Sequence, residues 1–154
     1  MKPRQRTRAA GIVIADSRVA LIKRDRNRRG KAYYIYPGGG VEKGESPEET
    51  AAREVLEETG LEIEVERLVA VVNRFGNEQF HFLARIIGGR LGTGTGPEMT
   101  GSYSPESGTY EAVWMEIGDL LVNPVYPPCV GELIVEASVS GWPSAPIRCV
   151  DEGD

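Results

Sequence analysis

Short apolar runs separated by turn residues make up most of the chain. Strands rich in β-branched and aromatic residues typically show this pattern, with Gly, Pro, Asn, Asp and Ser between them. Asp16-Ser17 and Gly76-Asn77 mark two of the expected turns. Six strands are predicted, over residues 8–15, 18–24, 32–37, 62–75, 79–89 and 109–117. Residues 88–108 contain many glycines and predict a long loop, of a length that is usually functional in a compact domain.

Helical periodicity predicts two helices, over residues 47–59 and 130–139. The first has strong boundary signals: Ser46 is a good N-cap, Ser46 and Glu49 form a capping box, and Gly60 ends the helix. Its apolar face predicts burial of Ala51, Ala52, Val55, Leu56 and Thr59. Glu54, Glu57 and Glu58 fall on roughly the opposite face.

Strands before and between the helices predict an α+β class, arranged as an α/β/α sandwich around a mixed β-sheet. A chain of 154 residues suits one domain with one core. We expect that domain to span residues 1–140. Residues 141–154 have weak periodicity and predict a loosely held C-terminal tail.

Composition narrows the function classes. The net charge of -5 offers no broad basic surface, so no nucleic acid polymer is expected as a partner. No run of 18 apolar residues occurs, which predicts no membrane span. The first apolar run is short and ends at Asp16, which predicts a strand rather than a signal peptide. Cys129 and Cys149 are expected to be reduced thiols in a cytoplasmic protein, although sequence alone leaves a bridge between them open.

The three glutamates on one helix face have two interpretations. A solvated acidic face is the common one, although Glu54 and Glu58 form an i,i+4 like-charge pair that costs about 0.2–0.5 kcal/mol. The other is a site for a hard cation such as Mg²⁺, which prefers carboxylate and phosphate oxygens. Spacing favours the second: Gly39, Glu45 and residues 53–61 match the pattern G-x5-E-x7-R-E-U-x-E-E-x-G-U, where U is aliphatic. The chain therefore resembles the Nudix hydrolase family, in particular its MutT-like members.

The resemblance implies the roles of several residues. By similarity, Glu57 and Glu58 are metal ligands and Glu54 is a ligand or the general base, with the Gly39 carbonyl as a further ligand. Arg53 is expected in the catalytic group, where it pairs with Glu45 and supports the loop against the helix. The expected cofactor is Mg²⁺, with Mn²⁺ as an alternative. Because parts of the family take a general base from a later loop, Glu98, Glu106 and Glu111 are also candidates.

Residues that bind substrate are less strongly indicated. Arg24 and Arg28 belong to a basic segment that suits an anionic substrate, and a solvated loop explains them equally well. Tyr34 is a candidate for stacking on a base, and Asn123 for reading a purine edge. His81, alone in an apolar strand, is expected to have a structural role.

The resemblance implies an enzyme that cleaves the diphosphate linkage of a nucleoside diphosphate derivative, such as a modified nucleoside triphosphate. Motifs associated with ADP-ribose, dinucleoside polyphosphate and NADH hydrolases were not found, which favours a small nucleotide substrate. A nucleotide-sugar or ADP-ribose hydrolase remains an alternative, as does a sensor that binds a nucleotide without cleaving it. A homodimer is one open possibility for the assembly.

Overall fold

The computed structural model describes residues 6–26, 31–96, 99 and 109–151. The strands are β1 (Arg8–Ala15), β2 (Arg18–Arg26), β3 (Lys31–Ile35), β4 (Gly38–Gly40), β5 (Leu61–Arg74), β6 (Asn77–Gly89), β7 (Thr109–Glu116), β8 (Val125–Tyr126) and β9 (Ile147–Val150). The helices are α1 (Pro47–Thr59), α2 (Pro128–Ser140) and the 3-10 turn η2 (Ile117–Asp119).

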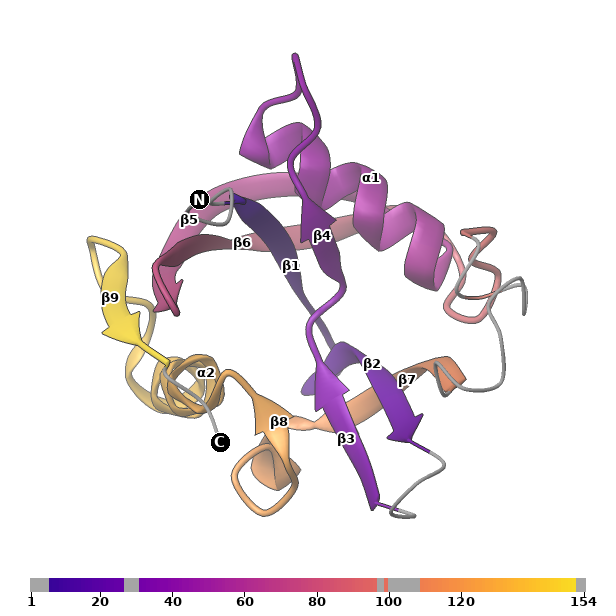
Figure 1. The fold of residues 1–154 in the computed structure, drawn as a ribbon. Coiled ribbons are helices and arrows are strands. Elements are labelled where there is room, and N and C mark those ends of the chain that lie inside the picture. Colours follow the sequence, from indigo (N-terminus) through magenta and orange to yellow (C-terminus); the bar gives the residue numbers. More distant parts are fainter. Residues whose placement is uncertain (1–5, 27–30, 97–98, 100–108, 152–154) are drawn as a thin grey trace.

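The strands form one mixed sheet in the order β8-β3-β2-β1-β6-β5-β9, with β4 paired to β1 and β7 paired to β2 (Figure 1). The pairs β1–β6, β5–β9 and β3–β8 are parallel, and the other pairs are antiparallel. Strand β1 joins the two halves, because it pairs with β2 at one end and lies between β4 and β6 at the other. The mixed sheet predicted from the sequence is confirmed.

The two helices cover opposite faces of β1. Successive side chains on a strand point to opposite faces. Ile12 belongs to the core cluster that holds Val130 and Ile134 of α2, whereas its neighbour Val13 packs with Val55 of α1. Figure 1 shows α1 and α2 on different sides of the sheet. The expected α/β/α layering is therefore confirmed.

Three short strands, β4, β8 and β9, were not predicted. Strand β4 consists of three glycines and has no apolar alternation that sequence analysis would detect. Strand β9 corrects the expectation of a loosely held tail. It runs parallel to β5 with Ile147 opposite Ala70, and Asp151 then forms an ion pair of 3.3 Å with Arg74.

The two cysteines are joined, contrary to the expected reduced thiols. A disulfide links Cys129, near the start of α2, to Cys149 on β9. The pairing could not be deduced from the sequence because the cysteines lie 20 residues apart and meet only once β9 has joined the sheet. Together, the disulfide and the strand pairing hold the end of the chain against the domain.

None of the helices within the described ranges is long and apolar enough to cross a membrane.

Candidate functional site

Helix α1 begins and ends as its sequence predicts. The Ser46 side chain accepts a hydrogen bond from the Glu49 backbone, and the Glu49 carboxylate accepts one from the Ser46 backbone, at 3.1 and 2.9 Å. Gly60 ends the helix in the left-handed region, with φ of 84°. These caps satisfy backbone groups that lack partners within the helix and fix the position of the carboxylates between them.

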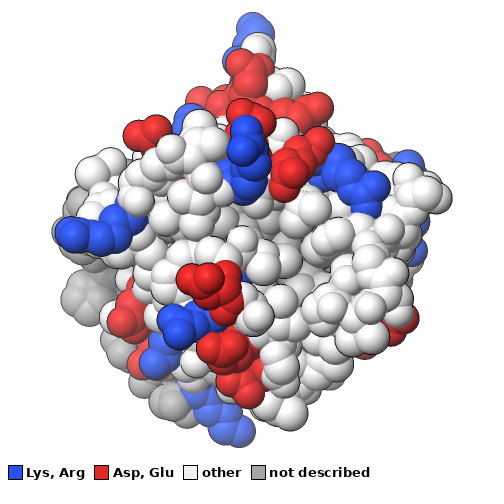
Figure 2. Space-filling model, turned by 180° about the vertical axis from the view of Figure 1, so that it is seen from behind, with Lys and Arg blue, Asp and Glu red and all other residues white. Residues whose placement is uncertain are grey.

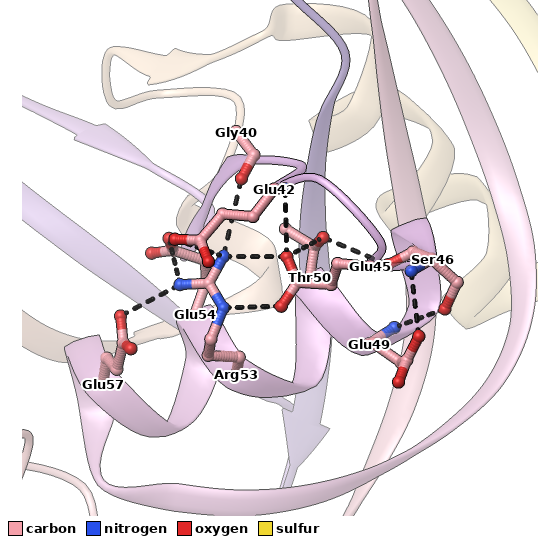
Figure 3. Close-up of polar contacts among 9 residues, drawn as sticks. All are labelled: Gly40, Glu42, Glu45, Ser46, Glu49, Thr50, Arg53, Glu54 and Glu57. Carbon is pink, nitrogen blue, oxygen red and sulfur yellow. Dashed lines mark hydrogen bonds and ion pairs between the residues drawn. The ribbon is translucent and has the colours of Figure 1, made fainter.

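Arg53 connects the loop before α1 to the glutamates of the helix (Figure 3). Its guanidinium donates two hydrogen bonds to the Glu45 carboxylate, at 2.7 and 3.0 Å. Nη1 also donates to Glu54, at 3.0 Å, and to Glu57, at 3.2 Å. A long contact of 3.5 Å from Nη2 reaches the Gly40 carbonyl. The predicted pairing of Arg53 with Glu45 is thus present in a bidentate form, the arrangement that gives an arginine–carboxylate pair its geometric specificity.

Glu45 is held as a carboxylate by its neighbours. Hydrogen bonds from Arg53, and then from the hydroxyl of buried Thr50 at 2.6 Å, lower the pKa of Glu45 to about 2. The same hydrogen bonds from Arg53 raise the pKa of the guanidinium further above its ordinary value. The pair therefore stays charged over the whole range in which the protein is folded and fixes the loop 41–46 to the helix.

The glutamates lie against the glycines of β4. The Glu58 carboxylate accepts a hydrogen bond of 2.7 Å from the Gly38 backbone and is only 4% exposed. A Cβ atom at Gly39 would overlap the Glu54 carboxylate, so only glycine permits this close approach. The predicted burial pattern is therefore partly wrong: Leu56 is 45% exposed, and Glu58 is buried because β4 supplies its partner.

The donor set of these residues fits a hard divalent cation. Glu54 and Glu57 each place a carboxylate oxygen on the same cationic nitrogen, Arg53 Nη1, so a positive charge already lies between them. Oxygen ligands of this kind are the ones that Mg²⁺ and Mn²⁺ prefer. Within the residues that the structure describes, no three carboxylate, imidazole or thiol side chains converge as a complete metal site. Glu58 faces Gly38 rather than Arg53, so the three glutamates are close in sequence but point to two partners.

The glycine-rich segment after β6 packs against the C-terminal end of α1. The backbone of Gly92 donates to the Thr59 carbonyl, and that of Gly96 to the Glu57 carbonyl, at 2.9 and 2.8 Å. A Cβ at Gly94 would lie 2.6 Å from the Glu57 carbonyl oxygen. In its described part, the segment thus satisfies helix-end carbonyls, a role that its composition did not reveal.

A pocket of about 240 Å³ begins at the same glycines. Its floor and walls come from β1, β4 and β6, from the end of β5, and from the segment that leads into α2. The side chains that matter most below are Arg8, Ala10, Tyr36, Arg74 and His81. Gly38 and Gly39 line the pocket and also contact Glu58 and Glu54, so the pocket and the carboxylates lie on two sides of β4.

The predicted substrate residues lie elsewhere. Tyr34 and Asn123 come together in an open depression of about 440 Å³ that also includes Glu111, and none of its lining residues lines the pocket at Gly39. Arg24 packs on β7, with its guanidinium 3.6 Å from the centre of the Tyr110 ring. Arg28, Glu98 and Glu106 lie outside the described residues.

Sequence analysis missed the pocket residues. Tyr36 and His81 are far apart in sequence and meet only through the sheet register, in which Ala10 pairs with Gly38 on one side and His81 on the other. The one available signal was a polar histidine within the apolar run of residues 79–89.

Charge is unevenly distributed over the surface. Figure 2, seen from behind, shows acidic side chains gathered at the end of the molecule where α1 lies, with basic side chains among them. The face drawn there has no broad basic patch, as expected from the net charge of -5.

Residues 5–129 match the family model described as the NUDIX domain. An ADP-ribose pyrophosphatase of Methanocaldococcus jannaschii is 38% identical over 90 residues, which cover 54% of this chain and 53% of that protein. A MutT-like protein of Streptomyces ambofaciens is 43% identical over 63 residues, or 40% of this chain and 38% of that protein. The fold is similar to that of a NUDIX hydrolase from Nitrosomonas europaea, with a TM-score of 0.73, 19% identity and coverage of 99% and 82% of the two chains. The matched stretches thus span about half or less of these two curated relatives.

Proposed function

The chain belongs to the NUDIX family, and on that premise we propose that it is a metal-dependent hydrolase that cleaves the diphosphate linkage of a nucleoside diphosphate derivative. One observation carries the proposal. Glu54 and Glu57 converge on one cationic nitrogen beside Gly39, and a pocket opens from the same glycine. An anionic diphosphate near the carboxylates would thus have room for the rest of its nucleotide.

The residues proposed to hold Mg²⁺ or Mn²⁺ are Glu54, Glu57, Glu58 and the carbonyl of Gly39. When bound, the metal neutralises diphosphate oxygens and lowers the pKa of a water molecule. Arg53 keeps Glu54 and Glu57 in place through its bidentate bond to Glu45. Gly39, which lacks a side chain, lets the substrate backbone approach the carboxylates closely.

Glu54 is the proposed general base, which accepts a proton from the attacking water. Its carboxylate side chain is 14% exposed and lies directly against Gly39, at the border between the helix and the pocket. Glu111 is a weaker candidate because it lines the separate depression with Tyr34 and Asn123. Glu98 and Glu106 stay predictions from the sequence.

Two substrate classes are supported by different observations. A modified nucleoside triphosphate follows from the likeness to MutT-like proteins. ADP-ribose, or a nucleotide sugar, is the second candidate because the archaeal relative is named an ADP-ribose pyrophosphatase. Arg8 and Arg74 line the pocket and suit a substrate that carries negative charge at that end. A nucleotide sensor on the same fold is the remaining alternative, and the full set of three glutamates disfavours it.

Other predictions from the sequence stay open. A homodimer is checked by the mass of the protein in solution. The cytoplasmic location is harder to reconcile with the disulfide, since such bonds are rare in reducing compartments.

The test is a turnover screen with Mg²⁺ and with Mn²⁺. Nucleoside triphosphates, oxidised nucleotides, nucleotide sugars and ADP-ribose are each incubated with the protein, and release of phosphate or pyrophosphate is measured. The Glu57→Gln variant is expected to lose activity at least about 100-fold while it stays folded. Glu48→Gln makes the same charge change at an exposed position of the first helical turn and should retain activity. Equal activity of the wild type and Glu57→Gln would contradict the metal assignment, and turnover of no substrate class would favour the sensor.

A further inference from the structure

Two buried polar atoms face the pocket at Gly39 without a hydrogen-bond partner in the described part of the chain: Tyr36 Oη and His81 Nδ1. Tyr36 is 4% exposed and His81 is 2% exposed. Native proteins pair nearly all buried polar atoms, because an unpaired one loses its hydrogen bonds to water and gains nothing. Two such atoms lining one pocket therefore indicate a ligand that supplies the partners.

The rings of these residues form a rigid corner. Their centroids lie 5.7 Å apart and their planes meet at 89°, an edge-to-face contact. Ala10 lies between them in the register, paired with Gly38 and with His81. Since its side chain is a single methyl group, the floor between the two rings stays open.

The chemistry of this corner suits a neutral, planar group. Burial lowers the pKa of His81 to about 4 and raises that of Tyr36, so both side chains are uncharged at neutral pH. A phenol and a neutral imidazole each offer a donor or an acceptor and no charge. The two cationic side chains that line the pocket are Arg8 and Arg74, and Arg74 is already paired with Asp151.

The size of the pocket limits the ligand further. Pockets for drug-sized ligands typically hold about 300–1,000 Å³, so about 240 Å³ suits one ring system rather than a whole nucleotide. Proteins read an unstacked base through hydrogen bonds to its edge and contacts with aromatic rings, and Tyr36, Tyr126 and His81 supply both. A base here leaves the diphosphate on the side of Gly39 and the glutamates.

We propose that Tyr36 and His81 determine the base specificity of this protein, by hydrogen-bonding the edge of the nucleobase in the pocket at Gly39. The proposal rests on the proposed function, because it places the diphosphate of the same nucleotide at Glu54 and Glu57. It assigns selectivity to two side chains outside the carboxylate helix. Neither side chain takes part in the bond cleavage.

Binding, measured apart from cleavage, tests the proposal. AMP, GMP, CMP and UMP share one ribose and one phosphate, contain no diphosphate to hydrolyse, and differ only in the base. Their dissociation constants, and that of ribose 5-phosphate, are measured by calorimetry for the wild type, Tyr36→Phe, His81→Leu and Tyr110→Phe. Tyr36→Phe removes one hydroxyl from an otherwise unchanged ring, so it keeps the test valid if His81→Leu does not fold. Tyr110→Phe removes a hydroxyl on β7 and is the matched control.

We expect the wild type to bind one monophosphate at least about tenfold more tightly than ribose 5-phosphate. Tyr36→Phe and His81→Leu should each weaken that preference about fivefold or more, with binding of ribose 5-phosphate unchanged. Tyr110→Phe should match the wild type. Equal preferences in the wild type and Tyr36→Phe would overturn the proposal, as would ribose 5-phosphate binding as tightly as the best monophosphate. Base-selective binding without any turnover would leave this inference standing and contradict the proposed hydrolase.

Discussion

His81 makes the stability of the protein depend on pH in a way that can be isolated. It is the only histidine in the chain, so no other side chain has its ordinary pKa near 6.5. Burial is the main cause that lowers its pKa to about 4 in the folded protein, and nearby Arg8 adds to the effect. A hydrogen bond with the Gln79 backbone opposes the shift in part.

The sign follows from proton uptake. Below pH 6.5 the unfolded chain binds a proton at His81 that the folded protein binds only near pH 4, so stability is lost as pH falls through this window. With about 1.36 kcal/mol for each pH unit, the free energy of unfolding should fall by about 1.3 kcal/mol between about pH 7.5 and 5.5. The full effect is about 3 kcal/mol near pH 4, where carboxyl groups also titrate.

Urea unfolding at several pH values measures this effect in the wild type and in His81→Leu. Above about pH 5.5 the variant should show almost no pH dependence, because the carboxyl groups titrate lower. Following the His81 ring protons by NMR gives the pKa of the folded state directly. An NMR pKa near 6.5, or the same pH dependence in both proteins, would refute the reasoning.

Three further predictions concern residues around the site. Arg53→Lys cannot form the bidentate bond, so kcat should fall about 10- to 100-fold with little change in melting temperature, and an unchanged kcat would contradict a positioning role. Breaking the disulfide with Cys129→Ser should lower the free energy of unfolding by about 3 kcal/mol, from the entropy of a loop of about 20 residues, and the melting temperature by about 6–12 °C; the wild type under reducing conditions should match it in calorimetry. Gly94→Ala places a Cβ against the Glu57 carbonyl and should destabilise the protein by about 1–3 kcal/mol in urea unfolding, whereas Gly118→Ala, with open space around its Cβ, should not.

Local signals account for the parts of the fold that were predicted. The limits of α1 follow from Ser46, Pro47 and Gly60, whose capping preferences act over a few residues. The turn at Asp16-Ser17 follows similarly: both residues have positive φ, of 51° and 63°, and the structure connects the two predicted strands there. The spacing of the Nudix pattern added the pairing of Arg53 with Glu45, which the structure contains.

Features that depend on register could not be predicted. The burial of Glu58 results from one hydrogen bond with Gly38, which is 20 residues away in the sequence. The pocket exists because β1 places Ala10 between β4 and β6, and no periodicity within β1 encodes its neighbours. The disulfide likewise depends on β9 pairing with β5.

The arrangement around Arg53 explains how a helix tolerates these glutamates before any metal binds. Adjacent like charges on a helix are unfavourable by a few tenths of a kcal/mol per pair, and Arg53 offsets this by bonding both Glu54 and Glu57. Its contact with Glu57 is the longer of the two, and the Glu57 side chain is 39% exposed, against 14% for Glu54. Glu57 is thus the carboxylate that can leave Arg53 most easily, because the two hydrogen bonds to Glu45 still hold the guanidinium in place. The bidentate pair therefore keeps the site organised while one glutamate changes partner.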